Sequence, residues 1–463
     1  MNNDFQLIKP RIVPPLDDEF RPAVLANQVF TSQCANVGIP LVIGIERESG
    51  KLSRFETCVF PEDHPQACAN IYYVERLVKF LLWQRGGVRL FIGGPSNIGD
   101  YIRREYSETG ARCFDALFMS NQVYEKPFSV EICEPHQVPP ANEGGEMIGR
   151  HLDGRRIGFD LGASDRKVSA VVDGRVIFSE EKIWNPSKQS DPAYHYNEIM
   201  DSLKTAASKL ERVDAIGGSS AGIYINNRPM VASLFRGIPP DRFPEIRDLF
   251  LRIGKEFNVP VVVINDGDVA ALAGAMSLED NGVLGIALGS SEAAGYVDLN
   301  GSILGWLNEL CFAPIDYNPH ASMDEWSRDI GCGSTYLSQQ CVFRLAPKVG
   351  IIIPQDLSNA EKLAFMQEKV KAGHVGAVQI WQTLGVYLGY GIAHYADFYD
   401  MKNVIILGRC TSGEGGMVMF NEIKRVLQNE FPDLAQRIHV QLMDEKNRRV
   451  GQSIGAASLP III

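Results

Sequence analysis

The sequence predicts an α/β protein with two or three domains, and three observations support this prediction. The chain has 463 residues, of which 45% are hydrophobic, so it can bury large cores and is too long for one ordinary domain. Strand-turn-strand segments with Gly and Asp in their turns alternate with segments whose apolar residues recur every three or four positions, as in helices. Residues 259–266, VPVVVIND, form an apolar run that ends in polar residues, which is typical of a buried strand that ends at a ligand site.

Charge and cysteine content narrow the class of function. The chain carries 45 Lys plus Arg against 56 Asp plus Glu, a formal net charge of -11. Because this charge gives no general attraction to nucleic acid or anionic lipid, we expect a small-molecule partner and neither a nucleic-acid nor a membrane partner. Nine cysteines without a repeated spacing indicate reduced thiols. With no signal-like leader and no apolar run of about eighteen residues, we expect a cytoplasmic protein.

The first 150 residues are expected to hold an arm and a small α/β extension. Residues 1–22 are Pro-rich and aperiodic, so they predict an extended arm that lies on the body or a disordered lead-in. Within residues 23–150 the pattern predicts, in order, a hairpin from Pro40, a helix at about Tyr73–Gln84, a strand VRLFIGG and a helix near Ile98–Tyr106. Residues 139–146, with their Pro, Asn and Gly, are the predicted boundary.

The remaining chain is expected to continue as alternating strands and helices. A hairpin follows Arg155, and a second strand-turn-strand segment starts at Gly282. Apolar residues at helical spacing predict helices around residues 199–210 and 246–257, and a long helix from Val375 to about Phe398. A strand NVIILG and a further helix come last.

The turn DLGAS, Asp160–Ser164, has the composition that phosphate binding requires. Small residues in a tight turn let backbone N–H groups approach phosphate oxygens, because a Cβ would block the approach. An Asp at the end of the preceding strand, here Asp160, can hold hydrated Mg²⁺, which bridges the phosphates during transfer. The turn is not specific by itself, because Gly-containing hairpins occur in many proteins for structural reasons.

Four such segments occur in a definite order, and the order is more specific than any one of them. They are DLGAS from Asp160, VINDGD from Val263, LGSSEAAG from Leu288 and ILGRCTSGEGG from Ile406. Together with the closing GQSIGAASLP they resemble the ROK family, the sugar kinases and related repressors of the actin-like ATPase superfamily. The resemblance covers roughly Arg155 to the C-terminus.

The resemblance implies an α/β fold of the actin-like ATPase (ribonuclease H-like) type, with two lobes and an additional N-terminal α/β segment. The first lobe would span residues 151–268 and include the C-terminal helix 449–463, and the second would span 269–448. ATP and Mg²⁺ are the implied cofactors, because the two hairpins resemble the family's phosphate motifs and the last Gly-rich turn resembles its adenosine motif. A homodimer is implied by the resemblance alone.

The resemblance also implies roles for single residues. Asp266 falls on the family's general base, Asn265 beside it would bind a sugar hydroxyl, and Glu309 resembles the Glu that grips the sugar. The structural alternative is that Asn265 and Asp266 only cap a helix beginning at Val269. The implied nucleotide ligands are Asp160, Gly162, Ala163, Ser164, Lys167, Gly289, Ser290, Ser291, Gly408, Arg409 and Gly413.

Three departures weaken a direct transfer of kinase activity. LGSSEAAG places Glu292 where phosphate would approach, and its charge would repel phosphate unless the side chain points to solvent or to a metal. Arg166 or Lys167 would suit a phosphate, but either equally suits a solvated hairpin tip. The stretch SSAGIYINNRPMVASLFRG lacks the family's Asn-Leu-Pro-Gly sugar pattern, so the sugar itself cannot be named.

The family's zinc site is expected to be missing. Phe312 stands where the zinc-binding His belongs, and Cys332 alone remains of the cysteine run. Because tetrahedral zinc needs four ligands, no zinc is expected. Cys311, His320 and Cys341 are possible substitutes that lack the spacing.

These observations predict an ATP-dependent carbohydrate kinase of ROK type, with Asp266 as the base. The alternative is an impaired relative that binds a sugar or nucleotide and regulates another process. The N-terminal segment begins with strands and has no basic recognition helix, so DNA binding is not expected. Its order of hairpin, helix and strand suggests a partial copy of an actin-like lobe, or else an unrelated cover domain.

Overall fold

The computed structural model describes residues 5–144, 148–443 and 445–462. The chain forms two compact units. Unit 1 contains Met1–Gly144, Ile286–Ala293 and Gly305–Leu442. Unit 2 contains Gly145–Gly285, Ala294–Leu304 and Met443–Ile463.

These units differ from the boundaries that the sequence suggested. The N-terminal segment does not form a unit of its own, because it shares unit 1 with residues 305–442. Residues 269–285 and 294–304, which were expected in the second lobe, belong to unit 2. Helices and strands were easier to predict than their grouping, because the grouping depends on contacts between distant parts of the chain.

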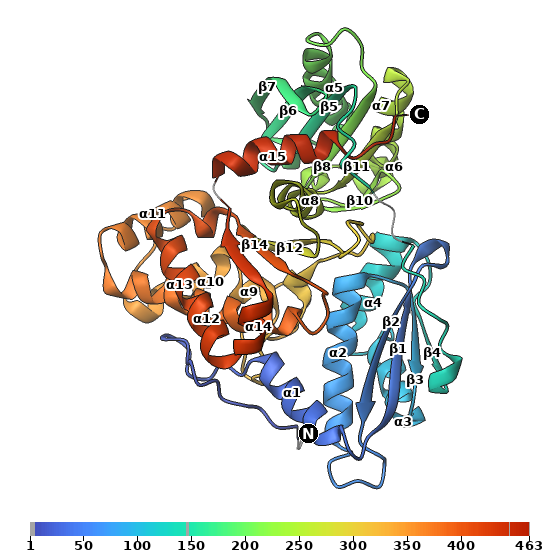
Figure 1. The fold of residues 1–463 in the computed structure, drawn as a ribbon, viewed down its shortest axis with the longest axis vertical. Coiled ribbons are helices and arrows are strands. Elements are labelled where there is room, and N and C mark those ends of the chain that lie inside the picture. Colours follow the sequence, from blue (N-terminus) through green and yellow to red (C-terminus); the bar gives the residue numbers. More distant parts are fainter. Residues whose placement is uncertain (1–4, 145–147, 444, 463) are drawn as a thin grey trace. The chain divides into compact units, whose positions relative to one another are not determined.

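A five-stranded sheet is the centre of unit 2, with the strand order β11-β8-β5-β6-β7. Strands β5, β6 and β7 are antiparallel neighbours, whereas β8 runs parallel to both β5 and β11. Figure 1 shows α5, α7 and α15 beside this sheet. The elements of unit 2 are β5 (Arg155–Leu161), β6 (Asp165–Val172), β7 (Arg175–Ile183), α5 (Pro192–Ala207), β8 (Ala215–Ser220), β9 (Ile223–Ile225), β10 (Arg228–Val231), α6 (Phe243–Arg247), α7 (Leu249–Phe257), β11 (Val261–Asn265), α8 (Asp266–Leu278) and α15 (Glu445–Ala457).

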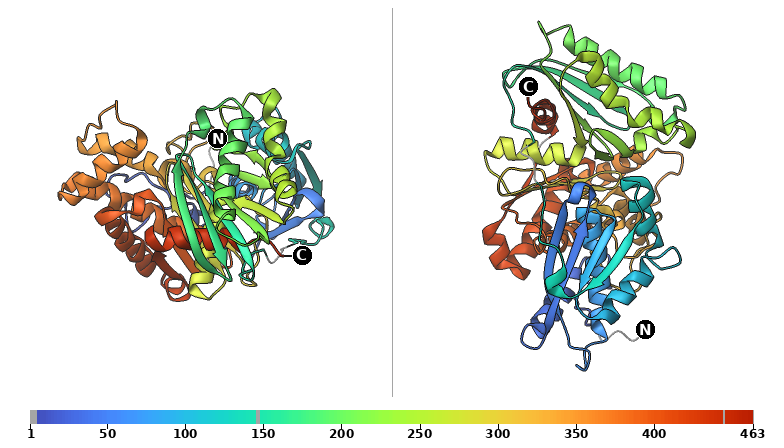
Figure 2. Two further views of the ribbon diagram at one scale, coloured as in Figure 1. Left: turned by 90° about the horizontal axis from the view of Figure 1, so that it is seen from above. Right: turned by 90° about the vertical axis from the view of Figure 1, so that its right-hand side faces the viewer.

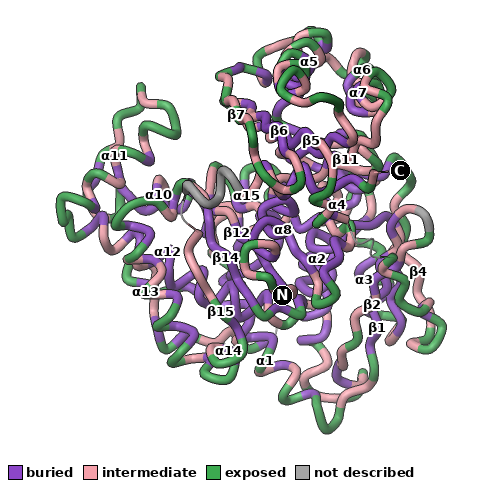
Figure 3. Tube along the Cα trace, turned by 45° about the horizontal axis from the view of Figure 1, so that its top comes forward, coloured by how far each residue is buried: buried purple, intermediate pink, exposed green. Residues whose placement is uncertain are grey.

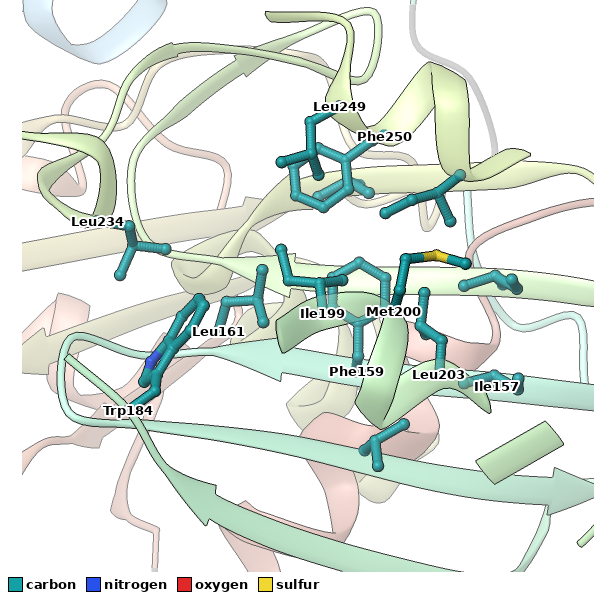
Figure 4. Packing of buried hydrophobic residues seen from close by; sticks show 14 of the residues in the cluster. Ile157, Phe159, Leu161, Trp184, Ile199, Met200, Leu203, Leu234, Leu249 and Phe250 are labelled. Atoms are coloured by element: carbon teal, nitrogen blue, oxygen red, sulfur yellow. The ribbon is translucent and has the colours of Figure 1, made fainter. Parts of the chain in front are cut away.

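Strand alternation determines the core of unit 2. Ile157, Phe159 and Leu161 of β5 point to the same face and are buried, as expected for a period of two residues. They pack with Ile199 and Met200 of α5 in one apolar cluster, which Figure 4 shows. The predicted helix 246–257 is two helices, α6 and α7, and α8 begins at Asp266 rather than at Val269.

The central strand β8 was not predicted, because its sequence AIGGSS lacks β-branched and aromatic residues at most positions. Its glycines have a packing role instead. A Cβ on Gly217 would collide with the backbone carbonyl oxygen of Ala456, so α15 can lie directly on this strand. Both views in Figure 2 show the red C-terminal helix against the green strands of unit 2.

Unit 1 contains two sheets and most of the helices. The N-terminal sheet has the order β2-β1-β3-β4, and the other has the order β13-β12-β14-β15. Residues of β12 (Val283–Leu288) and β13 (Glu292–Val297) are divided between the two units. The other elements of unit 1 are α1 (Ala23–Cys34), β1 (Ile39–Glu46), β2 (Leu52–Val59), α2 (Ala69–Arg85), β3 (Arg89–Gly93), α3 (Ser96–Glu105), α4 (Cys113–Leu117), β4 (Ser129–Cys133), α9 (Gly333–Tyr336), α10 (Gln339–Leu345), α11 (Asn359–Lys371), α12 (Val375–Tyr395), β14 (Asn403–Leu407), α13 (Gly413–Glu430), α14 (Pro432–Arg437) and β15 (His439–Leu442).

The N-terminal segment is not a partial copy of an actin-like lobe. Its third strand, β3, pairs antiparallel with β1, whereas in unit 2 the strand after the corresponding hairpin and helix, β8, pairs parallel with β5. The same order of elements along the chain therefore gives two different topologies. The hypothesis of a copy was wrong because element order alone does not determine strand direction.

Helix α2 is buried on almost every side, as its colouring in Figure 3 indicates. The ring of its residue Phe80 stacks on that of Phe398, with 4.0 Å between the centroids. The same ring meets His394 of α12 edge-on at 4.7 Å between centroids. The helix also carries Glu75, Arg76 and Lys79, which are all buried. Because a buried charge without a partner is costly, each of these side chains requires an oppositely charged partner within unit 1.

Residues 5–22 lie on the body of unit 1, one of the two outcomes that the sequence left open. They contain neither helix nor regular strand. The N–H of Leu16 donates to the Thr383 hydroxyl at 3.2 Å, and Phe20 is buried with its ring 4.8 Å from that of Tyr387. Both partners belong to α12, so this segment covers that helix.

Replacing Gly217 with alanine is expected to lower the free energy of unfolding by about 1–3 kcal/mol, because the added methyl must displace the backbone of α15. Urea unfolding of the full chain measures the change. Gly451→Ala on α15 is the control, because its Cβ would meet only the Ala273 Cβ, at 3.6 Å, and alanine favours the helix by about 0.8–1.0 kcal/mol. Equal destabilisation by both variants would contradict the close approach.

Candidate functional site

The parallel strands of unit 2 place polar residues at one edge of the sheet. Asp160 of β5 is in register with Ser219 of β8, and Ser220 of β8 is in register with Asn265 of β11. Because all three strands run in the same direction, these residues meet at the carboxyl edge. The sequence placed Asp160 and Asn265 at the ends of two strands, and the structure brings both strand ends to one edge together with Ser219 and Ser220.

The Asp160 carboxylate is held by a small hydrogen-bond network. Its Oδ1 accepts from the Ser219 hydroxyl at 2.7 Å and from the Gln452 side-chain amide at 3.3 Å. The same amide nitrogen lies 3.0 Å from the Ser219 oxygen. Lys167 reaches the other carboxylate oxygen at 3.8 Å and Asp165 at 3.0 Å. These hydrogen bonds and the nearby cation orient the carboxylate, which suits the coordination of a hydrated divalent cation.

The DLGAS turn is tight and its tip is exposed. The N–H of Gly162 donates to the carbonyl oxygen of Asp165 at 2.9 Å. The Trp184 indole N–H donates to the carbonyl oxygen of Gly162 at 2.8 Å. Ala163 and Ser164 between them are exposed. The turn is therefore fixed at its base, while its tip remains accessible to a ligand.

Alternation along β6 separates the two cations that the sequence considered. Arg166 is buried and forms ion pairs with Glu198 at 2.6 Å and Asp201 at 3.3 Å, so it faces α5. Lys167 points to the opposite face, on the side of Asp160. Lys167 is thus the cation at the strand ends, and Arg166 stabilises the packing of a helix.

Asn265 and Asp266 form the beginning of α8. The Asn265 side chain accepts from the N–H of Gly267 at 2.7 Å as the N-cap and donates to the carbonyl oxygen of Gly222 at 2.7 Å. Asp266 is the first helical residue and is half-buried. Burial, followed by the charge of Asp160, raises the pKa of Asp266 to about 6. A carboxyl group with this pKa is a base whose protonation changes near neutral pH.

In unit 1, the turn after β12 lies next to the turn after β14. Gly408 has a φ of +105°, and a Cβ there would collide with the backbone of Leu288, so only glycine fits. Ser290 and Ser291 are exposed. The N–H of Gly289 donates to the carbonyl oxygen of Ser291 at 3.0 Å and closes the turn.

The rest of the predicted adenosine motif follows Gly408. Arg409 begins a short 3-10 helix, Arg409–Thr411, and its carbonyl oxygen accepts from the Gln367 amide at 2.8 Å. Gly413 has a φ of +68°, opens α13 and is exposed. Unit 1 therefore brings the predicted residues 289–291 and 408–413 to one edge of its sheet.

Glu292 points away from this turn, into the interior of unit 1. It is 2% exposed, and its Oε1 accepts from the Tyr395 hydroxyl at 2.8 Å. Its Oε2 lies where a side chain on Gly333 would be and, among the described residues, accepts no hydrogen bond. Burial raises the pKa of Glu292 to about 8, against the opposing effect of Tyr395. At neutral pH this carboxyl is therefore mostly protonated, and it does not place a full negative charge at the turn.

Glu309 lies in a loop of unit 1 just before a short 3-10 helix, Leu310–Phe312. It is half-buried, and its carboxylate lies 3.7 Å from the Cys311 thiol, which donates to it. Burial, followed by the charges of Glu309 and Glu292, raises the pKa of Cys311 well above its ordinary value. Cys311 is therefore a neutral thiol beside Glu309.

The region where the sequence considered zinc is filled by aromatic side chains. Phe312 packs on Trp83 at 4.2 Å between ring centroids and on Phe114 at 5.8 Å. Cys332 and Cys341 are buried free thiols, and His320 is exposed. Across the described ranges, no group of three or more His, Cys, Asp or Glu side chains is arranged to hold a metal ion.

Of the side chains that bond to Asp160, the sequence analysis missed Ser219 and Gln452. Ser219 follows two glycines in a strand of low β-propensity, so nothing local marks it. Gln452 lies in GQSIGAASLP, which was noted for its resemblance and not for its amide. Their pairing with Asp160 depends on α15 lying against β5 and β8, which joins residues nearly 300 positions apart.

Comparison with solved structures identifies the fold. A ROK family glucokinase from Streptomyces griseus, solved with glucose and AMPPNP, has 20% identity and a TM-score of 0.50, and the match covers 66% of this chain and 99% of the glucokinase. A ROK hexokinase from Thermus thermophilus has 18% identity and a TM-score of 0.50, with 65% and 97% covered. The chain has the actin-like fold of ROK proteins. The resemblance inferred from the four ordered segments is thereby confirmed at the level of the fold.

Another match with this fold has a different function. A ROK family transcriptional regulator, a homologue of the E. coli Mlc protein, has 20% identity and a TM-score of 0.51, with 67% of this chain and 79% of the regulator covered. No family model matches the chain, and no curated protein matches it. Identities this low concern the fold, so the roles of single residues remain proposals.

Within the described part of the chain, no helix combines the length and the apolar composition that a transmembrane helix needs.

Replacing Glu292 with glutamine is expected to stabilise the protein increasingly as pH rises from 5 to 9. Between its ordinary pKa of 4.5 and about 8, the folded protein keeps a proton that the unfolded chain releases. Stability therefore falls with rising pH, by at most about 1.4 kcal/mol per pH unit. Glutamine has no proton to release, so urea midpoints of variant and wild type should diverge with pH.

The control for this prediction is Glu62→Gln, which changes an exposed glutamate of the same unit. Its midpoint should differ from that of the wild type by the same small amount at every pH. A pH-independent difference for Glu292→Gln would contradict the buried, protonated state.

Proposed function

We propose that the protein is an ATP-dependent carbohydrate kinase of ROK type, which transfers the γ-phosphate of ATP to a sugar hydroxyl. The observation that carries this proposal is the half-buried Asp266, next to Asp160 and with a pKa of about 6. A base must be unprotonated at working pH yet basic enough to accept a hydroxyl proton, and such a pKa meets both conditions. The fold of ROK glucokinase and hexokinase supports the same proposal.

In this mechanism the residues of unit 2 bind phosphate and accept the proton. Asp266 accepts the proton of the sugar hydroxyl as its oxygen attacks the γ-phosphorus. Lys167 and the backbone N–H groups of Ala163 and Ser164 bind phosphate oxygens, while Gly162 keeps the turn tight through its bonds to Asp165 and Trp184. Asp160, oriented by its hydrogen bonds, would hold Mg²⁺ through water, and the ion would neutralise charge on the phosphates.

The residues of unit 1 complete the assignment. The turn of Gly289, Ser290 and Ser291 would bind phosphate, and Gly408, Arg409 and Gly413 would bind the adenosine. This is consistent with Glu292, because its buried and protonated carboxyl leaves the turn without a repelling charge. Glu309 is proposed to bind a sugar hydroxyl. The glucokinase from Streptomyces griseus was solved with glucose and AMPPNP, which makes glucose the first sugar to test.

The second candidate is a regulatory protein that binds a sugar or nucleotide without transferring phosphate. Two observations favour it. The N–H of Gly289 is already bonded within its turn, and a ROK transcriptional regulator shares the fold. The kinase is preferred because a regulator has no need for a base with the pKa of Asp266.

Asp266→Asn is expected to reduce phosphoryl transfer by about 10²- to 10⁴-fold and to leave ATP affinity unchanged, because an amide cannot accept the proton. ADP release is measured with ATP, Mg²⁺ and a panel of monosaccharides beginning with D-glucose, and ATP binding is measured by calorimetry. Asp241→Asn, which changes an exposed aspartate of the same unit, should keep wild-type turnover. Undiminished turnover in Asp266→Asn would reject its role, and sugar binding without ADP release by the wild type would favour the regulator.

The activity is also expected to depend on pH through Asp266. As pH falls through about 6, the base becomes protonated, so kcat/KM for the sugar should decrease toward a tenfold loss per pH unit. Above that pH the base is ionised and the profile should level off. Initial rates between pH 5 and 8 measure the profile, and the absence of an acidic limb would contradict the assignment.

A further inference from the structure

We infer that the N-terminal segment, residues 23–144, positions the loop that carries Glu309, and that Glu143 is the main positioning side chain. This inference rests on the proposed function, in which Glu309 binds the sugar. The loop in question is residues 305–309, called the Glu309 loop below. Both the segment and the loop belong to unit 1.

The backbone of the Glu309 loop is bonded to the C-terminal turn of α2. The N–H of Asn308 donates to the carbonyl oxygen of Gln84 at 2.8 Å, and the N–H of Glu309 donates to that of Trp83 at 3.0 Å. The last carbonyl groups of a helix have no partner within the helix. The loop satisfies two of them, so its backbone is fixed at Glu309 itself.

Trp306 anchors the other end of the loop to the N-terminal segment. Its indole N–H donates to Oε2 of Glu143 at 2.8 Å. The guanidinium of Arg85, the last residue of α2, lies over its ring at 4.8 Å, which is a favourable cation–π geometry. Between these anchors, the Tyr399 hydroxyl donates to the Asn308 side chain at 2.9 Å. Only Gly305 of the loop is fully exposed.

Glu143 is in turn held in place by strands β1 and β2. The buried Arg47, directly after β1, donates to its Oε2 at 2.8 Å, and the Ser53 hydroxyl donates to the same oxygen at 2.9 Å. Arg85 lies 3.8 Å from its other oxygen. The Glu143 side chain is 27% exposed and that of Arg47 is 2% exposed, so this ion pair is largely desolvated. Such a pair holds its geometry better than a surface pair.

The chain that follows the loop is bound to the same segment. The ring of Phe312 packs on that of Trp83 and on those of Phe114 in α4 and Phe118 directly after α4. Asp329 forms ion pairs with Arg76 at 3.0 Å, Lys79 at 3.3 Å and Arg112 at 2.8 Å. Burial acts to raise the pKa of Asp329, but Arg76 and Lys79 outweigh it and hold the pKa below its ordinary value. The loop is therefore attached to a rigid base on both sides.

These contacts explain what the N-terminal segment contributes. A carboxylate that orients a substrate must be held within about 0.5 Å of its productive position, which a free loop does not achieve. The segment supplies the anchors of the Glu309 loop. The nucleotide ligands proposed in unit 1 lie on other elements, in the turns 289–291 and 408–413 after β12 and β14. Losing an anchor should thus weaken sugar recognition and leave nucleotide binding unchanged.

The test compares Glu143→Gln and Trp306→Phe with the wild type. Glutamine keeps an acceptor for the indole but loses the ion pair with Arg47, and phenylalanine keeps the ring over Arg85 but loses the N–H donor. In each variant the KM for D-glucose, or for the best monosaccharide of the activity screen, should rise about 10- to 100-fold. The KM for ATP should stay within about twofold, since the nucleotide ligands are untouched.

Two measurements separate positioning from general destabilisation. In a Glu309→Gln background, Glu143→Gln should have little further effect on the sugar KM, because Glu143 acts through Glu309. Hydrogen exchange of the peptide 305–312 should become faster in both anchor variants. Glu131→Gln is the matched control, because it removes a carboxylate from an exposed ion pair with Arg89 in the same sheet, away from the loop.

The outcomes distinguish this inference from the proposed function. An unchanged sugar KM in both anchor variants, or additive effects of Glu143→Gln and Glu309→Gln, would overturn the inference while leaving the kinase intact. If the wild type turns over no sugar, the kinase proposal fails by itself. The exchange data then decide: faster exchange at 305–312 supports the anchoring, and unchanged exchange overturns it.

Discussion

The burial of Glu75, Arg76 and Lys79 within α2 is the constraint on which unit 1 depends. Glu75, Arg76 and Lys79 are taken out of water, and leaving any of them without a partner would cost about 3–5 kcal/mol. Their partners come from two other parts of the chain. Lys79 pairs with Asp115 at 3.0 Å, Arg112 pairs with Glu75, and Asp329 completes the network more than 200 residues later. The N-terminal segment and the region around residue 329 must therefore fold as one body.

This constraint explains why the N-terminal segment is an integral part of unit 1. About a third of the chain has no counterpart in the matched glucokinase, and an unrelated cover domain would be expected to contact the body through exposed surface only. Here the contact is buried, and α2 packs on α12 through Phe80 and His394. Aromatic packing of Trp83 on Phe312 and the ion network on Asp329 act on successive parts of the same chain segment. They stabilise a region that otherwise consists largely of irregular backbone.

Unit 2 is organised by a different principle, close backbone packing. Gly217 of β8 and Gly158 of β5 let α15 approach the sheet, and this approach brings the Gln452 amide to Asp160 and Ser219. The hydrogen bonds orient Asp160, and the charge of Asp160 contributes, after burial, to the raised pKa of Asp266. The position of one helix therefore influences the basicity of a side chain on another element.

The sequence by itself determined the local features of this protein. The hairpin turns at residues 162–164 and 289–291, the polar end of β11, the long helix α12 and the ROK-type fold could be predicted, because hairpin turns, strand ends and helix faces follow from short patterns. Tertiary structure alone decided the inward direction of Glu292, the choice of Arg166 and not Lys167 to face α5, the strand β8 with Ser219, and the antiparallel pairing of β1 with β3. The physical reason is that each of these depends on burial and on partners far away in the chain, and neither leaves a periodic pattern in the sequence.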